Sequence, residues 1–307
     1  SEIKTINVIQ LIKLIALTLL VGIILNSSSL YIKATTWDDG LTKTVAVNIL
    51  KPISVATKAL GINLLRGKSR EAIGMKRDDK IDNFEFKKTM EELKVPVPSS
   101  TIPKLTPENK LTTWIIGDSL ATIPGESLLN NLGTSFDVYG LDSRVSTGFS
   151  RSDIFNWASN IQDFVTTRKP QAIIISIGAN DDQSIFVDGN PIGPFGTDAW
   201  KQAYLTRINA TLDFLAENNV HTLWVEIPPV RDPERGRRYD VINALTKTAI
   251  DAHPNTSTLV EIRAAFTDSD NTYRDSLPIN SQETLLRAPA GIHFTRAGGD
   301  LIASLVI

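Results

Sequence analysis

The sequence predicts an α/β fold: a doubly wound parallel sheet with flanking helices, in a flavodoxin-like three-layer arrangement, preceded by an N-terminal transmembrane helix. Apolar runs of strand length alternate with segments of helical periodicity from residue 109 onward. Such alternation is typical of a parallel sheet covered by helices on both faces. Ahead of these segments, near the N-terminus, the twelve consecutive residues 14–25 carry no charge and are nearly all apolar.

The composition is that of a folded chain, and it excludes several classes of site. The 307 residues have a formal charge of −2, with 42% hydrophobic and 21% charged residues. This balance excludes the broad basic surface of a dedicated nucleic-acid binder, so no nucleic-acid partner is expected. The chain contains no Cys, which excludes disulfides, thiolate metal sites and a cysteine nucleophile.

Residues 1–33 are expected to form a cytoplasmic tip and a membrane anchor. The twenty residues 6–25 would make about 30 Å of helix, the thickness of a bilayer core. Lys4 and Lys13 precede the uncharged run, so the positive-inside rule places the N-terminus in the cytoplasm. The protein is therefore expected to be single-pass in the inner membrane, with its C-terminal domain periplasmic or extracellular.

Two other readings of this segment remain open. A cleavable signal peptide is the main alternative, because the uncharged core is also of signal-peptide size, although no A-x-A cleavage pattern follows it. A buried hydrophobic hairpin helix is the less favoured reading. We expect an uncleaved anchor.

Residues 34–108 are expected to be a membrane-proximal helical spacer followed by a linker. The segments 45–50 and 53–60 suggest short helices interrupted by Pro52 and Gly61. Residues 95–103 contain three prolines, which is typical of a stiff, extended linker. The region carries no recognisable chemistry and is interpreted as a spacer or a partner-docking element.

Residues 109–307 are expected to form the α/β domain. Apolar strands are predicted at 111–116, 172–177 and 221–227. Helices are predicted through Tyr204, Ile208, Leu212 and Leu215, at 239–252 and at 295–305. In such folds ligands bind beyond the carboxyl ends of the strands, so the chemistry is expected there.

Three short polar segments lie at these strand and helix ends. Residues 117–120 (Gly-Asp-Ser-Leu) follow the first strand, and residues 178–181 (Gly-Ala-Asn-Asp) follow the second. Residues 291–294 (Gly-Ile-His-Phe) come directly before the last helix. Each alone is a weak signal, because a Ser after a strand is usually a helix cap and an Asn in a loop is usually a turn former.

Together and in this order, the segments resemble those of the SGNH hydrolases, also called the GDSL family of serine esterases and acyltransferases. The resemblance covers about residues 110–307, and residues 146–151 (Ser-Thr-Gly-Phe-Ser-Arg) match the family's second block. It implies that Ser119 is the nucleophile and His293 its general base. It also implies an oxyanion hole made by the backbone N–H groups of Ser119 and Gly148 and the side-chain amide of Asn180.

One position departs from the family pattern. The family places an aspartate three residues before the catalytic histidine, and here that position is Ala290. Alanine cannot orient an imidazole, and loss of the equivalent acid in a triad lowers turnover about 10⁴-fold. Either Ala290 is a substitution that traps an inactive enzyme, which the intact surrounding motif favours, or the protein is naturally weakened and a backbone carbonyl or another acid orients His293.

Other polar residues beyond the strand ends have less specific roles. We expect Arg144, Arg151, Glu226 and Arg231 either to line the substrate cleft or to form structural ion pairs at its rim. We expect Asp118 to brace its turn.

The remaining titratable and aromatic candidates are interpreted as structural. His221 and His253 are read as solvated or capping residues, and the acids 181 and 182 as solvated. Trp157 and Trp224 are assigned to the core. Neither a metal nor any other cofactor is expected.

The resemblance implies a serine-dependent acyl-ester hydrolase, of the O-acetyl esterase type, acting on an envelope or secreted glycan through an acyl-Ser119 intermediate. A transferase that moves an acetyl group onto a sugar hydroxyl, working beside a polytopic membrane O-acyltransferase, is the first alternative. A non-catalytic family member that binds glycan or organises a complex is the second, and Ala290 permits it.

Overall fold

The computed structural model describes residues 7–35, 41–62, 68–69, 72, 84–86, 110–131, 136–187 and 190–307. The chain divides into two units, Ser1–Ile81 and Asp82–Ile307, and each is described by itself. The predicted Pro-rich linker at 95–103 lies outside the described residues.

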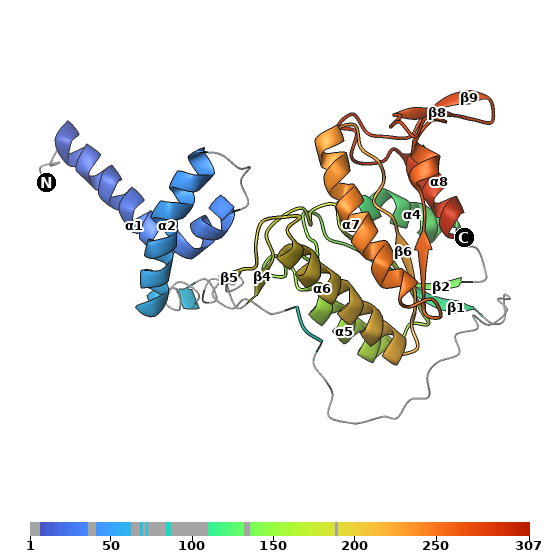
Figure 1. Ribbon diagram of the computed structural model, residues 1–307, viewed down its shortest axis with the longest axis horizontal. Coiled ribbons are helices and arrows are strands. Elements are labelled where there is room, and N and C mark those ends of the chain that lie inside the picture. The colour runs from blue at the N-terminus through green and yellow to red at the C-terminus, as the bar shows by residue number, and fades with distance from the viewer. Residues whose placement is uncertain are drawn as a thin grey trace, which may run out of the picture. The chain divides into compact units, whose positions relative to one another are not determined.

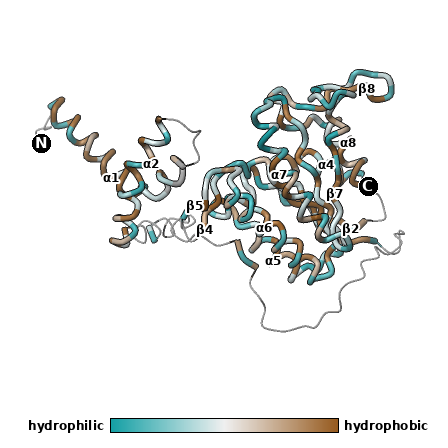
Figure 2. The backbone as a smooth tube through the Cα atoms, in the orientation of Figure 1, coloured by the Kyte–Doolittle hydropathy of each residue, from teal (hydrophilic) through white to brown (hydrophobic). Residues whose placement is uncertain are grey.

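In the described part of the first unit lie the long helices α1 (Val8–Thr35) and α2 (Leu41–Ala59). Within the described residues, α1 alone is long and apolar enough to cross a membrane, over Val8–Ser28. Figure 2 shows that α1 is hydrophobic along most of its length. Its large apolar side chains are exposed around the helix, so the helix is not buried as the hairpin reading required. The predicted break at Gly61 is confirmed, because α2 ends before it and Gly61 has a φ of 68°.

The predicted interruption of the helix at Pro52 is wrong, because α2 runs through it. Proline removes one backbone hydrogen bond from a helix, and side-chain contacts with α1 just beyond this point help to hold α2 in place. Thr57 Oγ1 lies 2.7 Å from Ser27 Oγ, and Ser54 Oγ lies 3.0 Å from Ser28 Oγ. These interhelical hydroxyl pairs are long-range contacts that local helix rules do not include.

The second unit is built on a five-stranded sheet (Figure 1). The strands are β1 (Leu111–Gly117), β2 (Phe136–Ser143), β3 (Ala172–Ser176), β6 (His221–Val225) and β7 (Ser257–Val260). Their order is β2-β1-β3-β6-β7, and every neighbouring pair is parallel. This arrangement confirms the predicted α/β fold with a parallel sheet.

Helices cover both faces of this sheet. Helix α4 (Thr122–Asn131) packs against α8 (Arg296–Val306), and α6 (Asp198–Glu217) packs against both α5 (Trp157–Arg168) and α7 (Pro233–Asp251). The short helices η1 and η2 span Ser119–Ala121 and Arg263–Phe266. Two small hairpins complete the unit: β4 (Phe186–Val187) with β5 (Asn190–Pro191), and β8 (Ser276–Ile279) with β9 (Gln282–Leu285).

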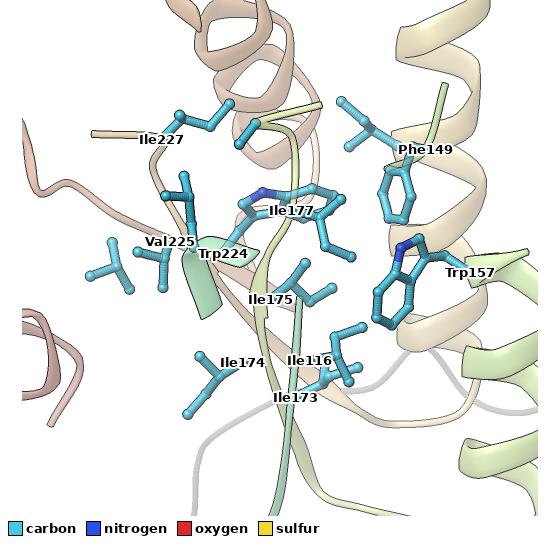
Figure 3. Packing of buried hydrophobic residues seen from close by; sticks show 14 of the residues in the cluster. Ile116, Phe149, Trp157, Ile173, Ile174, Ile175, Ile177, Trp224, Val225 and Ile227 are labelled. Carbon is cyan, nitrogen blue, oxygen red and sulfur yellow. The ribbon is translucent and has the colours of Figure 1, made fainter. Parts of the chain in front are cut away.

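The core lies between the sheet and its helices (Figure 3). Ile173, Ile174 and Ile175 of β3 are all buried, although neighbouring side chains of a strand point to opposite faces. Both faces of the central strand are therefore covered, as its continuous apolar run predicts. Trp157 and Trp224 are buried in the same core, which confirms their assignment.

The packed unit extends toward the N-terminus beyond residue 109. Phe84 is buried and packs edge-on against Phe149, with ring centroids 4.9 Å apart. Phe86 stacks on Phe214 of α6 at 4.4 Å, and the Arg207 guanidinium lies 5.3 Å from the centre of the Phe84 ring. Residues 84–86, predicted to belong to a spacer, thus contribute apolar contacts to the α/β unit.

Gly117 tests how tightly β1 and β3 are packed where the site begins. A Cβ at this position would lie closer than 3.0 Å to the Ser176 carbonyl oxygen and to the Ala121 side chain. We expect Gly117→Ala to lower the free energy of unfolding by about 1–3 kcal/mol, the usual cost of overpacking. Denaturant unfolding of the full chain in detergent measures this change.

Gly236→Ala provides the matched control, because nothing lies within 4 Å of its added Cβ. It replaces a glycine inside α7, so unchanged or slightly higher stability is expected. Equal stability of the two variants would contradict the close approach at Gly117.

Candidate active site

The candidate catalytic residues lie at the carboxyl edge of the sheet. Ser119 follows β1 and Asn180 follows β3, and these two strands are neighbours. After β1 the chain pairs β2 on one side and then returns to pair β3 on the other. Such a reversal of strand order is the usual ligand position in open α/β sheets.

Ser119 and His293 are brought into direct contact. Ser119 Oγ lies 2.9 Å from His293 Nε2, although 174 residues separate them in the chain. Ser119 begins η1 and is partly exposed, while His293 is exposed just ahead of α8. This distance suits transfer of the hydroxyl proton to the imidazole.

Asp118 braces the turn that carries the serine, as predicted. Its buried carboxylate accepts hydrogen bonds from the backbone N–H groups of Leu120 (2.8 Å), Gly178 (3.0 Å) and Ala179 (2.9 Å). It therefore ties the loop after β1 to the loop after β3. Burial raises the pKa of Asp118 to about 7, against the opposing effect of the three N–H donors.

Asn180 is held against the second sequence block. Its Nδ2 donates to the carbonyl oxygen of Thr147 at 3.0 Å, and Thr147 directly precedes Gly148. Gly148 is buried, and a Cβ on it would lie closer than 3.0 Å to the Asp181 carboxylate. The structure thus places Asn180 beside the block that carries Gly148, and only glycine fits at position 148.

Asp181 is a residue that sequence reasoning misread. Predicted to be solvated, it is fully buried. Its carboxylate accepts from the N–H groups of Phe149 (3.0 Å) and Ser150 (2.7 Å) and from the Tyr204 hydroxyl (2.8 Å). Burial raises the pKa of Asp181, and these hydrogen bonds oppose the rise. The neighbouring Asp182 lies at the surface side of the loop, 3.6 Å from Arg238.

Arg207 holds the same block from the other side. Its buried guanidinium donates to the carbonyl oxygen of Phe149, and to that of Phe186 at 3.0 Å. Burial lowers the pKa of Arg207 to about 10, while the charge of Asp181 acts in the opposite direction. Both backbone polar groups of Phe149, the residue after Gly148, are therefore fixed by buried side chains.

The position of the family's aspartate is an exposed turn. Ala290 lies in this turn, three residues before His293. Within the described parts of the chain, no hydrogen bond to His293 Nδ1 is found. The serine therefore contacts the imidazole at Nε2, and none of the described side chains accepts a hydrogen bond from its other nitrogen.

Two arginines hold the loop that carries His293 by its backbone. Arg231 Nη1 donates to the Pro289 carbonyl oxygen at 2.6 Å, while its Nη2 lies 2.7 Å from both carboxylate oxygens of Asp275. Arg287 is buried and donates to the carbonyl oxygens of Ile292 (2.5 Å) and Gly291 (3.3 Å). We call Arg231 and Arg287 the loop clamp.

Gly291 makes the close approach of this loop possible. Its φ of 69° is in the left-handed region, and a Cβ there would lie 2.6 Å from the Arg231 Cβ. Its N–H donates to the Ala288 carbonyl oxygen at 2.8 Å, and the Ala288 N–H donates to that of His293 at 2.8 Å. The loop is thus a closed turn, and the loop clamp donates hydrogen bonds to the carbonyl oxygens of Pro289, Gly291 and Ile292.

The two arginines predicted to line the cleft beside the second block have partners within the chain. Arg144 pairs with Asp142. Arg151 pairs with Asp153 at 2.8 Å and donates to Gln183 Oε1 at 2.7 Å. These contacts match the structural ion pairs that were the alternative reading, and a contact with substrate stays a prediction.

Glu226 and Arg231 are likewise engaged. Glu226 Oε2 accepts from the N–H groups of Ile262 and Arg263 at 3.0 Å each, so it holds the start of η2. Arg231 is the clamp residue described above. The contacts of both side chains support a structural role, and substrate binding by them stays a prediction.

The other two histidines also have partners within the chain. His221 Nε2 lies 3.1 Å from Thr258 Oγ1, and burial lowers the pKa of His221. His253 contacts the Ala249 carbonyl oxygen at 2.7 Å and Asp213 at 2.9 Å. Among the residues that the structure describes, no group of three or more His, Cys, Asp or Glu is placed to hold a metal ion.

Comparisons with known proteins cover this α/β unit. Residues 112–307 match the model of the family described as "Protein of unknown function (DUF459)". No curated protein matches the chain.

Several solved structures are similar. A putative SGNH hydrolase from Slackia heliotrinireducens is 14% identical, with a TM-score of 0.43, covering 64% of this chain and 97% of that one. A GDSL-like lipase from Bacteroides thetaiotaomicron is 14% identical, with a TM-score of 0.41 and coverages of 69% and 89%. The psychrotrophic esterase EstA from Pseudoalteromonas sp. is 15% identical, with a TM-score of 0.42 and coverages of 64% and 94%.

The loop clamp predicts a measurable loss of order in the histidine loop. Arg231→Ala keeps the Cβ that touches Gly291 but removes the hydrogen bond to Pro289. We expect the N–H groups of Ala288 and Gly291 to exchange with deuterium about tenfold faster, the effect of losing about 1.4 kcal/mol of local stability. Hydrogen exchange followed by mass spectrometry of peptides covering 288–293 measures this.

Arg237→Ala is the matched control for this exchange experiment. Arg237 is an exposed arginine that pairs with Glu234, one turn away at 3.3 Å, so exchange at 288–293 should stay unchanged. Unchanged exchange in Arg231→Ala as well would show that the backbone alone holds the loop.

Proposed function

The chain belongs to the DUF459 family, and we propose that it is a serine acyl-ester hydrolase of the SGNH type. The observation that carries the proposal is the 2.9 Å contact between Ser119 Oγ and His293 Nε2. It is supported by Asn180 and Gly148, which belong to a connected set of loops at the same edge of the sheet.

The reaction is a double displacement. As Ser119 Oγ attacks the ester carbonyl carbon, its proton passes to His293 Nε2 and the carbonyl oxygen becomes an oxyanion. The N–H groups of Ser119 and Gly148 and the Asn180 amide donate to this oxyanion. The intermediate collapses to acyl-Ser119, and the leaving alkoxide takes the proton from His293. Water then repeats the sequence and releases the acid.

The buried carboxylates act on this reaction through the backbone. Asp181 and Arg207 fix Phe149 and so fix the position of the adjacent Gly148 N–H. Asp118 holds the turn of Ser119 to the loop of Asn180. An oxyanion hole is effective because its donors are already in place, and removal of one donor typically costs about 3 kcal/mol of barrier lowering.

Ala290 is proposed to impair the present chain. The loop clamp supports the position of His293, but no carboxylate in the described part of the chain contacts it to stabilise the imidazolium that forms during each transfer. The aspartate of a triad both orients the histidine and stabilises its positive charge. Here the loop clamp replaces only the orienting role. We therefore propose slow turnover with the serine and histidine chemistry otherwise intact.

The site of action is proposed to be outside the cytoplasmic membrane. The exposed apolar helix α1 supports an inner-membrane anchor, and Lys4 and Lys13 ahead of its apolar core support a cytoplasmic N-terminus. An O-acylated envelope or secreted glycan is the substrate class that fits an esterase in this compartment.

A transferase is the second candidate function. The same acyl-Ser119 intermediate can pass its acyl group to a sugar hydroxyl instead of water. The observation that favours this candidate is the apolar surface of α1, exposed around the helix, which is suited to contact other membrane helices, such as those of a polytopic O-acyltransferase.

Restoring the acid at position 290 tests the proposal. We expect Ala290→Asp to raise kcat on a small acetyl ester by up to about 10⁴-fold, because the acid orients His293 and stabilises its protonated form. Ala290→Asn is the matched control, since it offers a hydrogen bond without the charge, and should raise kcat far less. Ester hydrolysis is followed by release of a chromogenic alcohol.

Further variants separate the candidate functions. Ser119→Ala in the Ala290→Asp chain should abolish turnover, and retained turnover would exclude Ser119 as the nucleophile. Absence of turnover in every variant would favour the non-catalytic reading. With an oligosaccharide acceptor present, acylated sugar in excess over free acid would identify a transferase.

A further inference from the structure

Helix α2 exposes an apolar face that has no role in the proposed ester hydrolysis. Five large apolar side chains of α2 and the residue after it are between 47% and 81% exposed: Leu41, Val45, Ile49, Val55 and Leu60. At 100° per residue they fall on one side of the helix. This set is called the apolar face of α2.

The apolar face points away from α1. Ser54 and Thr57 are the buried residues of α2, and they contact Ser28 and Ser27 of α1. The side of α2 opposite these hydroxyls is the side that carries Val45 and Ile49. Among the described residues of the first unit, none is buried against this face, and its large apolar side chains stay exposed.

The contact between the helices fixes where along α1 this face lies. Ser27 and Ser28 are the last residues of the stretch Val8–Ser28 that is long and apolar enough to cross a membrane. Figure 1 shows α2 crossing α1 rather than continuing it. When α1 spans a bilayer, α2 is consequently held where the hydrocarbon core gives way to the head groups.

The charges of α2 suit that depth and exclude a second span. The helix contains no Asp or Glu, and Lys51 and Lys58 are exposed. Lys51 lies near the middle of the helix, next to Pro52, where a membrane-spanning helix would bear a large cost for the charge. Exposed apolar and basic side chains on one helix are typical of helices that lie in the membrane interface.

We propose that α2 is an interfacial membrane-binding helix. Its apolar face enters the boundary between acyl chains and head groups, and Lys51 and Lys58 attract anionic lipid head groups. The inference rests on the proposed anchor α1 and adds a second attachment that fixes the depth at which the chain leaves the bilayer. The occupant of the apolar face is thus the lipid surface.

Because the sequence contains no Cys, a single introduced thiol can carry a fluorophore at a chosen position. Ile49→Cys is labelled with an environment-sensitive dye, and the full-length chain is reconstituted into phosphatidylcholine vesicles with or without phosphatidylglycerol. Lipids with spin-label quenchers near the head group or near the chain end report depth. Leu17→Cys in α1 and Ser281→Cys in the exposed β8–β9 turn are the controls.

We expect the label at 49 to emit at shorter wavelength than in water and to be quenched more by the shallow than by the deep quencher. The label at 17 should show the reverse order, and the label at 281 should be quenched by neither. Replacing both lysines, with Lys51→Gln and Lys58→Gln, should remove the extra shallow quenching that phosphatidylglycerol produces at 49.

Each other outcome overturns a defined part of the inference. Water-like emission at 49 with deep quenching at 17 would overturn the interfacial helix and leave the anchor standing. Water-like emission at both positions would overturn the anchor as well. Short-wavelength emission at 49 without lipid quenching would place a protein surface, such as a second copy, over the face. An unchanged phosphatidylglycerol effect in the lysine variant would overturn the charge contribution.

Discussion

The buried carboxylate of Asp118 is the interaction on which the arrangement of the site depends. It accepts three backbone N–H groups, one from the turn of Ser119 and two from the loop of Asn180. Those loops follow neighbouring parallel strands, and the absent Cβ of Gly117 lets them approach. A buried carboxylate is stable only when such donors surround it. Asp118 therefore holds the two loops together, and the folded loops in turn supply the donors that Asp118 needs.

Asp181 and Arg207 likewise hold backbone groups with buried charged side chains, at the loop that contains Phe149. They also mark a limit of what the sequence could predict. Alternating apolar runs predicted the parallel sheet, and the family resemblance carried by the three polar segments implied that Ser119 and His293 act together. Nothing local distinguishes a buried Asp181 from a solvated one. Its donors, Phe149 and Ser150, lie more than thirty residues away, so only the folded chain identifies them.

The continuation of α2 through Pro52 and the loop clamp also depend on contacts between residues that are far apart in the sequence. Helix rules weigh the hydrogen bond that proline removes, but not hydroxyl pairs with another helix. The sequence near Ala290 shows that the family's acid is missing. It does not show that Arg231, which follows β6, donates a hydrogen bond to this loop. Among the described residues, His293 is held in position but has no charge partner, which accounts for both the intact geometry and the proposed slow turnover.

The proposal that His293 activates Ser119 as a nucleophile is tested most directly by covalent labelling with a fluorophosphonate. We expect one adduct, mapped by mass spectrometry to the peptide that contains Ser119. It should be absent from Ser119→Ala, strongly reduced in His293→Ala, and formed faster in Ala290→Asp. Labelling that persists unchanged in Ser119→Ala, or no adduct in any variant that retains the fold, would contradict it.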